Sequence, residues 1–125
     1  MRFFKNLFLS LCLIGILSSL NSQEYNLNSP IDLPLKLSGT FGEFRSSHFH
    51  YGLDITTNKR SGYKVYSIDS GSIVRIRVST NGYGKALYID HPNGLTSVYA
   101  HLKEFSPEIQ EYIKSQQYLN KSYNI

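Results

Sequence analysis

The sequence has no tryptophan and only one cysteine and one methionine among its 125 residues. The cysteine, Cys12, lies in the apolar N-terminal segment, so the rest of the chain has no thiol for a disulfide bond or a thiol active site. With 4 prolines, 9 glycines and 41% hydrophobic residues, the composition excludes collagen-like sequence and long disorder. The length leaves room for one small domain.

The excess of basic over acidic residues is also small. Thirteen Lys and Arg residues against nine Asp and Glu residues give a formal net charge of +4. Two of the basic residues, Arg2 and Lys5, precede the apolar segment, which leaves the remaining chain only slightly basic. Because a nucleic-acid-binding face needs a strong basic patch, we expect no nucleic-acid partner.

The first 22 residues have the pattern of an export signal. A positively charged start is followed by an apolar run, Leu7–Leu17, and by small polar residues up to Ser22. The run is shorter than the roughly 20 apolar residues that span a membrane, so we expect no stable membrane span after cleavage. An uncleaved anchor is the alternative. An exported product would lie in the periplasm or cell envelope, or be secreted.

The middle of the chain has the pattern of antiparallel β structure. Residues 23–36 are a polar lead-in with two prolines, which predicts an extended arm. In the segment Ile73–Val78, Val74, Ile76 and Val78 alternate with arginines, which predicts a strand with these three side chains on one face. Glycine-containing turns separate it from two further predicted strands, Lys85–Asp90 and Leu95–Leu102, and such short connections join antiparallel neighbours.

The tail has helical periodicity. Ser106 is suited to the N-cap and Pro107 to the first turn, where its missing N–H is harmless. Ile109, Tyr112 and Ile113 follow at helical spacing, so we predict a helix from Pro107 to about Leu119. We therefore assign residues 37–125 to one partial domain with a helical insertion at about residues 106–120.

His50 and Asp54 are the candidate metal ligands. Imidazole nitrogen and carboxylate oxygen both suit a zinc ion that keeps one position open for water. On a regular strand, residues four apart lie about 13 Å from each other, too far to share one ion. The spacing therefore requires a bend, which is least costly at Gly52. Taken alone, the same spacing also occurs among polar residues of surface loops.

Several motifs occur together between Gly39 and Leu102. They are Gly39-Thr40-Phe41-Gly42-Glu43-Phe44-Arg45, His50-Tyr51-Gly52-Leu53-Asp54-Ile55, Gly82-Tyr83-Gly84, Ile89-Asp90-His91-Pro92-Asn93-Gly94 and Tyr99-Ala100-His101-Leu102. In order and spacing this stretch resembles the lysostaphin/LytM-type zinc metallopeptidases, which cut the peptide bridges of bacterial peptidoglycan. The resemblance covers the amino-terminal part of that domain.

This resemblance implies a fold, a cofactor and a substrate. The fold would be mainly β, a small antiparallel sheet with a substrate groove like a duplicated hybrid motif, incomplete at its C-terminus and with one peripheral helix. His50 and Asp54 would bind Zn²⁺, His101 would assist catalysis, and peptidoglycan peptides would be the substrate. Arg45 would orient substrate beside the groove or form a structural ion pair. His48 and His91 match no ligand of the family.

One part of the family pattern is missing. The third zinc ligand of the family lies in a downstream H-x-H motif whose first histidine is also catalytic, and no histidine follows His101 here. We therefore expect an inactive amino-terminal fragment of a longer zinc endopeptidase, or a truncated gene product. The first alternative is a non-catalytic LytM-like domain that binds a partner or a wall peptide. The second is a lipoyl-type carrier module, with Lys85 beside Gly84 as the residue nearest to a hairpin tip.

The leader generates the first testable prediction. Cleavage near Ser22 should give a mature chain beginning at or near Gln23, because the small-residue end of the leader marks the processing site. Mass spectrometry of the extracytoplasmic fraction measures this directly. A chain in that fraction that still carries Met1 would contradict it and favour the uncleaved anchor.

Overall fold

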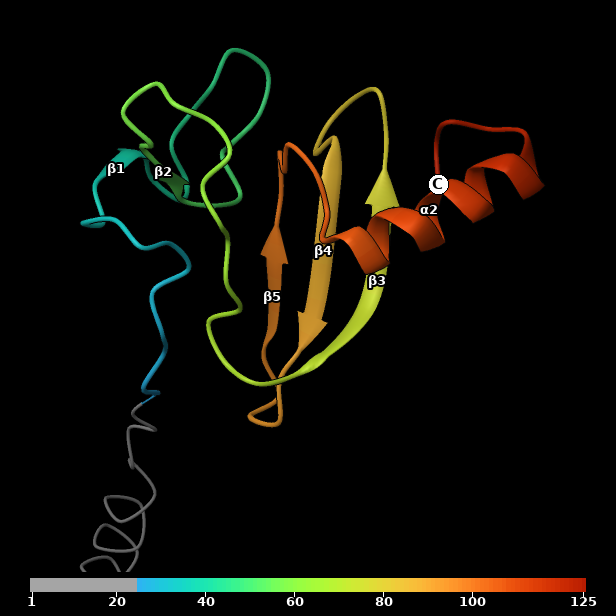
Figure 1. Cartoon of the computed structure of the whole chain (residues 1–125). Helices are drawn as coiled ribbons and strands as arrows, with labels where there is room; N and C mark the ends of the chain where they lie inside the picture. The colour runs from blue at the N-terminus through green and yellow to red at the C-terminus, as the bar shows by residue number, and fades with distance from the viewer. Residues whose placement is uncertain (1–24) are drawn as a thin grey trace, which may run out of the picture.

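The computed structural model describes residues 25–125, so the predicted export signal lies outside the described residues. The described chain is mainly β, as predicted, with its strands divided between two small antiparallel sheets that do not close into a barrel (Figure 1). One sheet pairs β1 with β2 and the other has the order β3-β4-β5. The elements are β1 (Leu37–Gly39), β2 (Asp54–Ile55), β3 (Ser72–Val78), β4 (Lys85–Asp90), β5 (Thr96–Tyr99) and α2 (Pro107–Asn120).

The three-stranded sheet consists of two successive hairpins, as the short turns predicted. In the first hairpin Val78 lies opposite Lys85, and the Ser79 N–H donates to the Gly84 carbonyl across the turn. Gly82 and Gly84 have φ values of 67° and 61°, which glycine adopts without steric cost. The turn glycines therefore account for the tight connection between β3 and β4.

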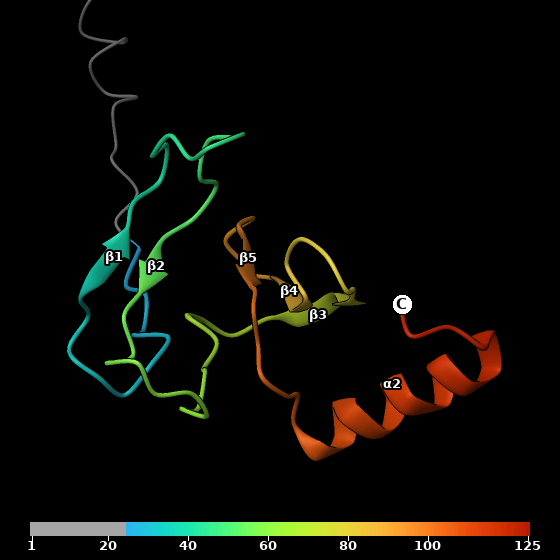
Figure 2. The same ribbon diagram turned by 90° about the horizontal axis from the view of Figure 1, so that it is seen from above.

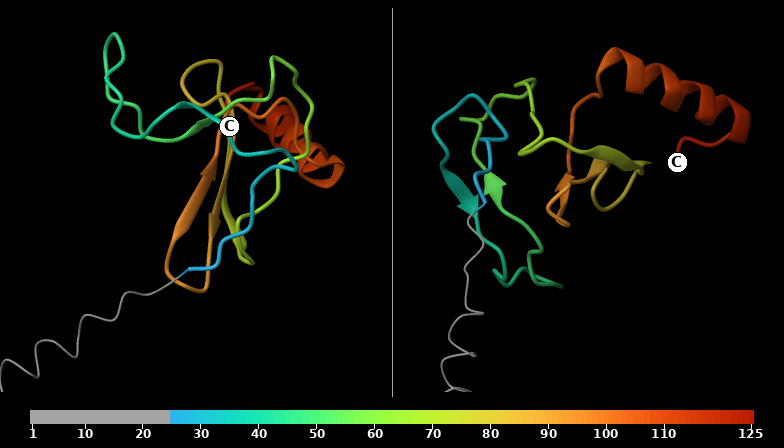
Figure 3. Two further views of the ribbon diagram at one scale, coloured as in Figure 1. Left: turned by 90° about the vertical axis from the view of Figure 1, so that its left-hand side faces the viewer. Right: turned by 90° about the horizontal axis from the view of Figure 1, so that it is seen from below.

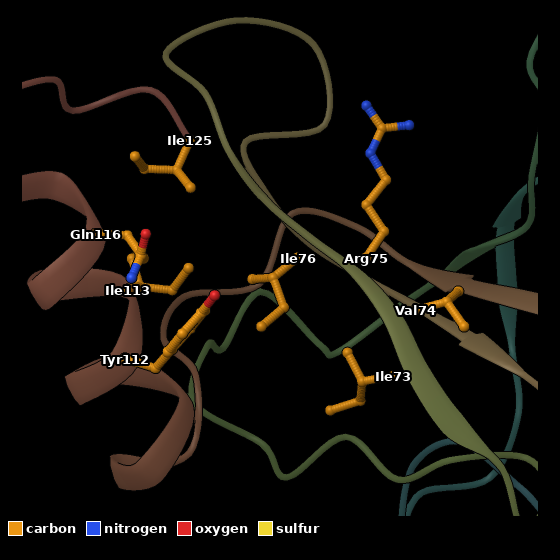
Figure 4. Close-up of a pocket in the computed structure, with 8 residues that line it drawn as sticks. All are labelled: Ile73, Val74, Arg75, Ile76, Tyr112, Ile113, Gln116 and Ile125. Atoms are coloured by element: carbon orange, nitrogen blue, oxygen red, sulfur yellow. The ribbon is translucent and has the colours of Figure 1, made fainter. Parts of the chain in front are cut away.

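Strand β3 contains a bulge that the alternating pattern did not reveal. Ile73 pairs with Ile89 and Arg75 with Tyr88, so one extra residue, Val74, lies between them. A bulge shifts the alternation of side chains by one residue. Ile73 consequently points toward α2 together with Ile76, whereas Val74 points away and is 54% exposed (Figure 4). The prediction that Val74 shares a face with Ile76 was wrong.

Strand β5 ends earlier than predicted. It stops at Tyr99, and His101 has a φ of 54°, in the left-handed region that an extended strand cannot contain. The N–H groups of His101 and Leu102 still donate to the carbonyls of Tyr83 (2.9 Å) and Lys85 (3.1 Å). The segment after β5 therefore remains beside β4 and the preceding turn.

The hydrophobic core lies between the three-stranded sheet and α2. Figures 2 and 3 show α2 along one face of this sheet on the side of β3, with the two-stranded sheet on the side of β5. Val78 and Ile113 are each 1% exposed and pack with Phe105. The partly buried hydrophobic residues around this cluster are Ile76, Leu87, Leu102, Ile109 and Ile125.

The helix has the predicted bounds and the predicted N-cap residue, but not the capping hydrogen bond. Ser106 occupies the N-cap position, yet its side chain makes no capping hydrogen bond. Proline in the first turn removes one of the N–H groups that would otherwise need a partner. At the other end Lys121 is left-handed, and its N–H donates to the carbonyls of Gln117 and Tyr118. The chain then returns to β3, where Ile125 and Val78 exchange two backbone hydrogen bonds of 2.9 and 2.8 Å.

The lead-in segment runs against residues 65–68. Ile31 forms an isolated antiparallel bridge with Val65 and is 7% exposed. The Tyr66 hydroxyl donates to Asp32 at 2.8 Å, and this hydrogen bond raises the pKa of Tyr66. The arm is therefore attached to the segment that leads into β3.

A pocket of about 290 Å³ opens between β3 and α2 (Figure 4). None of the candidate site residues lines it, so the substrate groove stays a prediction. Within residues 25–125 no helix has the length and apolar character needed to cross a membrane. The residues that line the pocket are Ile73, Val74, Arg75, Ile76, Tyr112, Ile113, Gln116 and Ile125.

The core generates a stability prediction. Ile113→Ala should lower the free energy of unfolding by about 2–5 kcal/mol, because it leaves a cavity between α2 and β3. Leu119→Ala, in the same helix but at a residue 76% exposed, should change it by less than about 0.5 kcal/mol. Urea unfolding followed by circular dichroism measures both. Equal losses in the two variants would contradict the position of the core.

Candidate functional site

The loop between β1 and β2 folds back on itself as an irregular hairpin. The N–H of Gly42 donates to the carbonyl of His50, and the N–H of His50 donates to the carbonyl of Glu43, each at 2.8 Å. Closer to the tip of the loop, the N–H of Arg45 donates to the carbonyl of His48, and Phe44 and Phe49 form an isolated antiparallel β-bridge. This pairing returns His50 to a position beside the end of β1.

The His50 side chain is held by a backbone carbonyl. Its Nδ1 lies 2.9 Å from the carbonyl oxygen of Thr40, and the side chain is only 14% exposed. Because a carbonyl oxygen can only accept a hydrogen bond, Nδ1 must carry the proton in this contact. In the neutral ring Nε2 then carries the lone pair, the arrangement usual for a metal-binding histidine, whereas in the protonated ring Nε2 donates to Asp54 Oδ1.

Asp54 meets His50 because the chain bends between them. The bend falls at Gly52, where we predicted it, and β2 begins at Asp54. Asp54 Oδ1 lies 3.3 Å from His50 Nε2, although a straight strand would hold these residues about 13 Å apart. The two predicted ligands therefore present one nitrogen and one oxygen to the same point.

The second oxygen of Asp54 is paired with Arg45. The guanidinium Nη2 donates to Asp54 Oδ2 and lies 3.6 Å from Glu43 Oε2. The structure therefore contains the ion pair that was the alternative for Arg45, and the substrate-binding role stays a prediction. The hydrogen bond from Arg45 lowers the pKa of Asp54 and raises the pKa of Arg45. Desolvation of the carboxyl opposes the lowering, and the positive charges of Arg45, His50 and His101 add to it.

His101 belongs to the same electrostatic environment. Its charge contributes to lowering the pKa of Asp54, which places it within electrostatic reach of the His50–Asp54 pair. Its ring packs edge-on against Tyr83, with centroids 6.4 Å apart, and the residue is exposed. His101 is one of four non-glycine residues with positive φ among residues 25–125, together with Asn58, Lys59 and Lys121.

A family model for peptidase family M23 matches residues 48–124 of the chain, a segment that contains His50, Asp54 and His101. The chain belongs to peptidase family M23. No curated protein and no solved structure matches it significantly. The family membership predicted from the motifs is therefore confirmed. Membership of this family indicates a peptidase-type, hydrolytic function.

The other two histidines of the M23 domain have different surroundings. His91 is 6% exposed, with Nδ1 2.7 Å from the Ser70 carbonyl and Nε2 2.8 Å from Ser97 Oγ. Both ring nitrogens are engaged, so His91 ties the turn after β4 to its neighbours. His48 is exposed and lies 3.2 Å from Ser47 Oγ.

The lysine of the carrier alternative is also engaged. Lys85 Nζ donates to the carbonyl of Lys103 at 3.0 Å and lies 6.0 Å from the centroid of the Phe105 ring. An attachment lysine must instead project freely from a hairpin tip. The position of Lys85 in β4 therefore argues against a carrier module.

The distance between His50 Nε2 and Asp54 Oδ1 is compatible with two ligands of one ion, and equally with a direct ion pair when His50 is protonated. Two donor atoms about 2.0–2.1 Å from one tetrahedral ion lie about 3.3 Å apart, which is the separation of His50 Nε2 and Asp54 Oδ1. Among residues 25–125 no group of three or more His, Cys, Asp or Glu side chains could hold a metal. Zinc binding by His50 and Asp54 therefore stays a prediction.

Two residues that support the site were not predicted from the sequence. The carbonyl of Thr40 orients His50, and Gly39 lies directly beneath the Arg45–Asp54 pair. Both residues belong to the motif Gly39–Arg45, which was the only feature of the sequence that pointed to them. Thr40 contributes through its backbone carbonyl and Gly39 through its lack of a Cβ. Neither contribution comes from a reactive side chain, so neither residue was a candidate.

The ion pair generates a prediction about pH. A lowered pKa in the folded state contributes stability that is present above the unfolded value of about 3.9 and is lost as the pH falls through the folded value. Arg45→Met should raise the pKa of Asp54 toward its ordinary value and make the acid dependence of unfolding shallower. Carboxyl carbon NMR titration and urea unfolding from pH 2 to 6 measure these effects. An unchanged Asp54 titration in this variant would contradict the assignment, and Arg75→Met is the matched control.

Proposed function

We propose that the chain is part of a zinc-dependent endopeptidase that hydrolyses peptide cross-links of bacterial peptidoglycan. The observation that supports this most is the 3.3 Å separation of His50 Nε2 and Asp54 Oδ1, with His50 Nδ1 held by Thr40. Membership of peptidase family M23 supports the hydrolytic class. Both the metal and the substrate are part of the proposal.

His50 and Asp54 would hold the zinc ion, which when bound supplies a Lewis acid for the scissile carbonyl and lowers the pKa of water toward about 7. The Asp54 carboxylate is ionised at neutral pH, as a metal ligand must be, and the hydrogen bond from Arg45 lowers its pKa further. His101 would act as the proton carrier. A neutral imidazole accepts a proton from the attacking water and later donates it to the leaving amine.

The substrate and the location are proposed together. An exported enzyme reaches the cell wall, and the resemblance of the motifs to wall-cutting endopeptidases supplies the peptide cross-link as substrate. His101 and the loop that carries His50 are largely exposed, which suits a polymeric substrate that approaches from solvent. The leader of residues 1–22 supports a proposed location in the periplasm, in the cell envelope or outside the cell.

We further propose that the third ligand and the second catalytic histidine belong to a segment following Ile125 in a longer form of the protein. Zinc sites that catalyse hydrolysis use three protein ligands and keep a fourth position for water or substrate. The second candidate function is a non-catalytic domain that binds a partner or a wall peptide. It is favoured by the absence of a third suitable donor near His50 and Asp54 among residues 25–125.

Zinc binding tests the proposed ligands. The 125-residue chain should bind zinc weakly, and His50→Ala should weaken binding by at least tenfold, because it removes one of two ligands. His48→Ala is the matched control, since this exposed histidine lies in the same loop and should leave binding unchanged. Isothermal titration calorimetry measures both. Equal affinities in the two variants would contradict the assignment of His50.

Hydrolysis of wall peptides separates the two candidate functions. The 125-residue chain should be inactive, whereas a longer form that supplies an H-x-H motif should release fragments from purified peptidoglycan in a His101-dependent way. Mass spectrometry of the released peptides measures this. Full activity of the short chain would show that the site is complete without such a motif. An inactive longer form that still binds wall peptides would favour the binding domain.

A further inference from the structure

The two oxygens of the Asp54 carboxylate have different partners. Oδ2 accepts a hydrogen bond from Arg45 Nη2, and Oδ1 faces His50 Nε2 at 3.3 Å. A free carboxylate can rotate and offer both oxygens to a metal ion. Here the guanidinium occupies one oxygen and leaves the other directed toward His50.

The Arg45–Asp54 pair rests on the backbone of β1. Gly39 is buried, and a Cβ at this position would lie 2.6 Å from both Arg45 Nη2 and Asp54 Oδ2. Real Cβ atoms do not approach other atoms so closely, so any larger residue would displace the pair. Gly39 and Asp54 are also register partners across β1 and β2. The absence of a side chain at Gly39 therefore fixes where the guanidinium and the carboxylate meet.

Arg45 is itself held in place from the same loop. Glu43 Oε2 lies 3.6 Å from its Nη2, and its backbone N–H donates to the His48 carbonyl. Side chains of Arg45 and Asp54 are 37% and 41% exposed. Ion pairs this exposed contribute little to folding stability, because water screens them. The pair matters more for the direction of the carboxylate than for the stability of the fold.

We propose that Arg45, seated on Gly39, is a positioning residue that confines Asp54 to metal binding through Oδ1 alone. This inference rests on the proposed zinc function. A zinc ion in a catalytic site has few coordination positions, and water and substrate need the ones that the protein ligands leave open. A carboxylate bound through both oxygens would take one more of them. In a site completed by a third protein ligand, Arg45 would thus preserve an open coordination position without touching the metal or the substrate.

Infrared spectroscopy of the carboxylate tests this inference. The frequency separation between the asymmetric and symmetric carboxylate stretches is larger for a carboxylate that binds a metal through one oxygen than for one that binds through both. In chain labelled with ¹³C at aspartate carboxyls, the zinc-minus-apo difference spectrum isolates the aspartate that binds. The wild-type chain at saturating zinc should show the wide separation, and Arg45→Met should show the narrow one.

Two further variants make the test specific. Gly39→Ala keeps Arg45 but displaces it from Asp54, so it should also narrow the separation, by a second route. Arg75→Met removes an exposed arginine that lies over Tyr88 in the other sheet, and it should leave the spectrum unchanged. Arg45→Lys should restore part of the wide separation, because lysine retains the charge but not the planar fork.

The outcomes distinguish this inference from the function on which it rests. A wide separation in folded Arg45→Met would overturn the positioning role while leaving the zinc site intact. Loss of the folded circular dichroism spectrum in Arg45→Met would overturn it too, because Arg45 would then be a structural residue. A wild-type chain without any zinc-induced carboxylate change would instead overturn the proposed zinc function and this inference with it.

Discussion

The chain reversal between β1 and β2 is the constraint on which the candidate site depends. One loop leaves β1, pairs with itself through the backbone of Glu43 and His50, and re-enters at β2 two residues after Gly52. Only this reversal places His50 next to the Thr40 carbonyl and turns Asp54 toward it. The candidate site is therefore a property of one local loop, with His101 added from the segment that follows β5.

The hydrophobic core and the candidate site occupy different parts of the molecule. Val78 and Ile113 are buried between β3 and α2, whereas β1 and β2, which begins at Asp54, lie on the side of β5 (Figure 2). Strand β2 has two residues and contributes no fully buried hydrophobic side chain. Polar contacts, rather than apolar burial, consequently determine the geometry around the ligands. The site depends on the direction of a few hydrogen bonds more than on the packing of the core.

The sequence predicted the features that depend on local pattern. Alternation and glycine turns located β3 and β4, proline and helical spacing located α2, and the spacing of His50 and Asp54 required the bend at Gly52. The bulge at Val74 and the early end of β5 were missed, because both depend on pairing with another strand. The support from Gly39 was missed for the same kind of reason: a Cβ there would touch residues 6 and 15 positions away. Contacts between residues this far apart in the chain cannot be predicted from a local sequence pattern.

The left-handed backbone at His101 has a consequence for how this position can vary. For a residue with a Cβ this conformation is unfavourable by on the order of 1 kcal/mol, and its N–H bond to the Tyr83 carbonyl helps to maintain it. Glycine would relieve the backbone there, and asparagine would relieve part of it, but each would remove the imidazole. The backbone conformation and the proposed proton transfer by His101 therefore favour different residues at the same position.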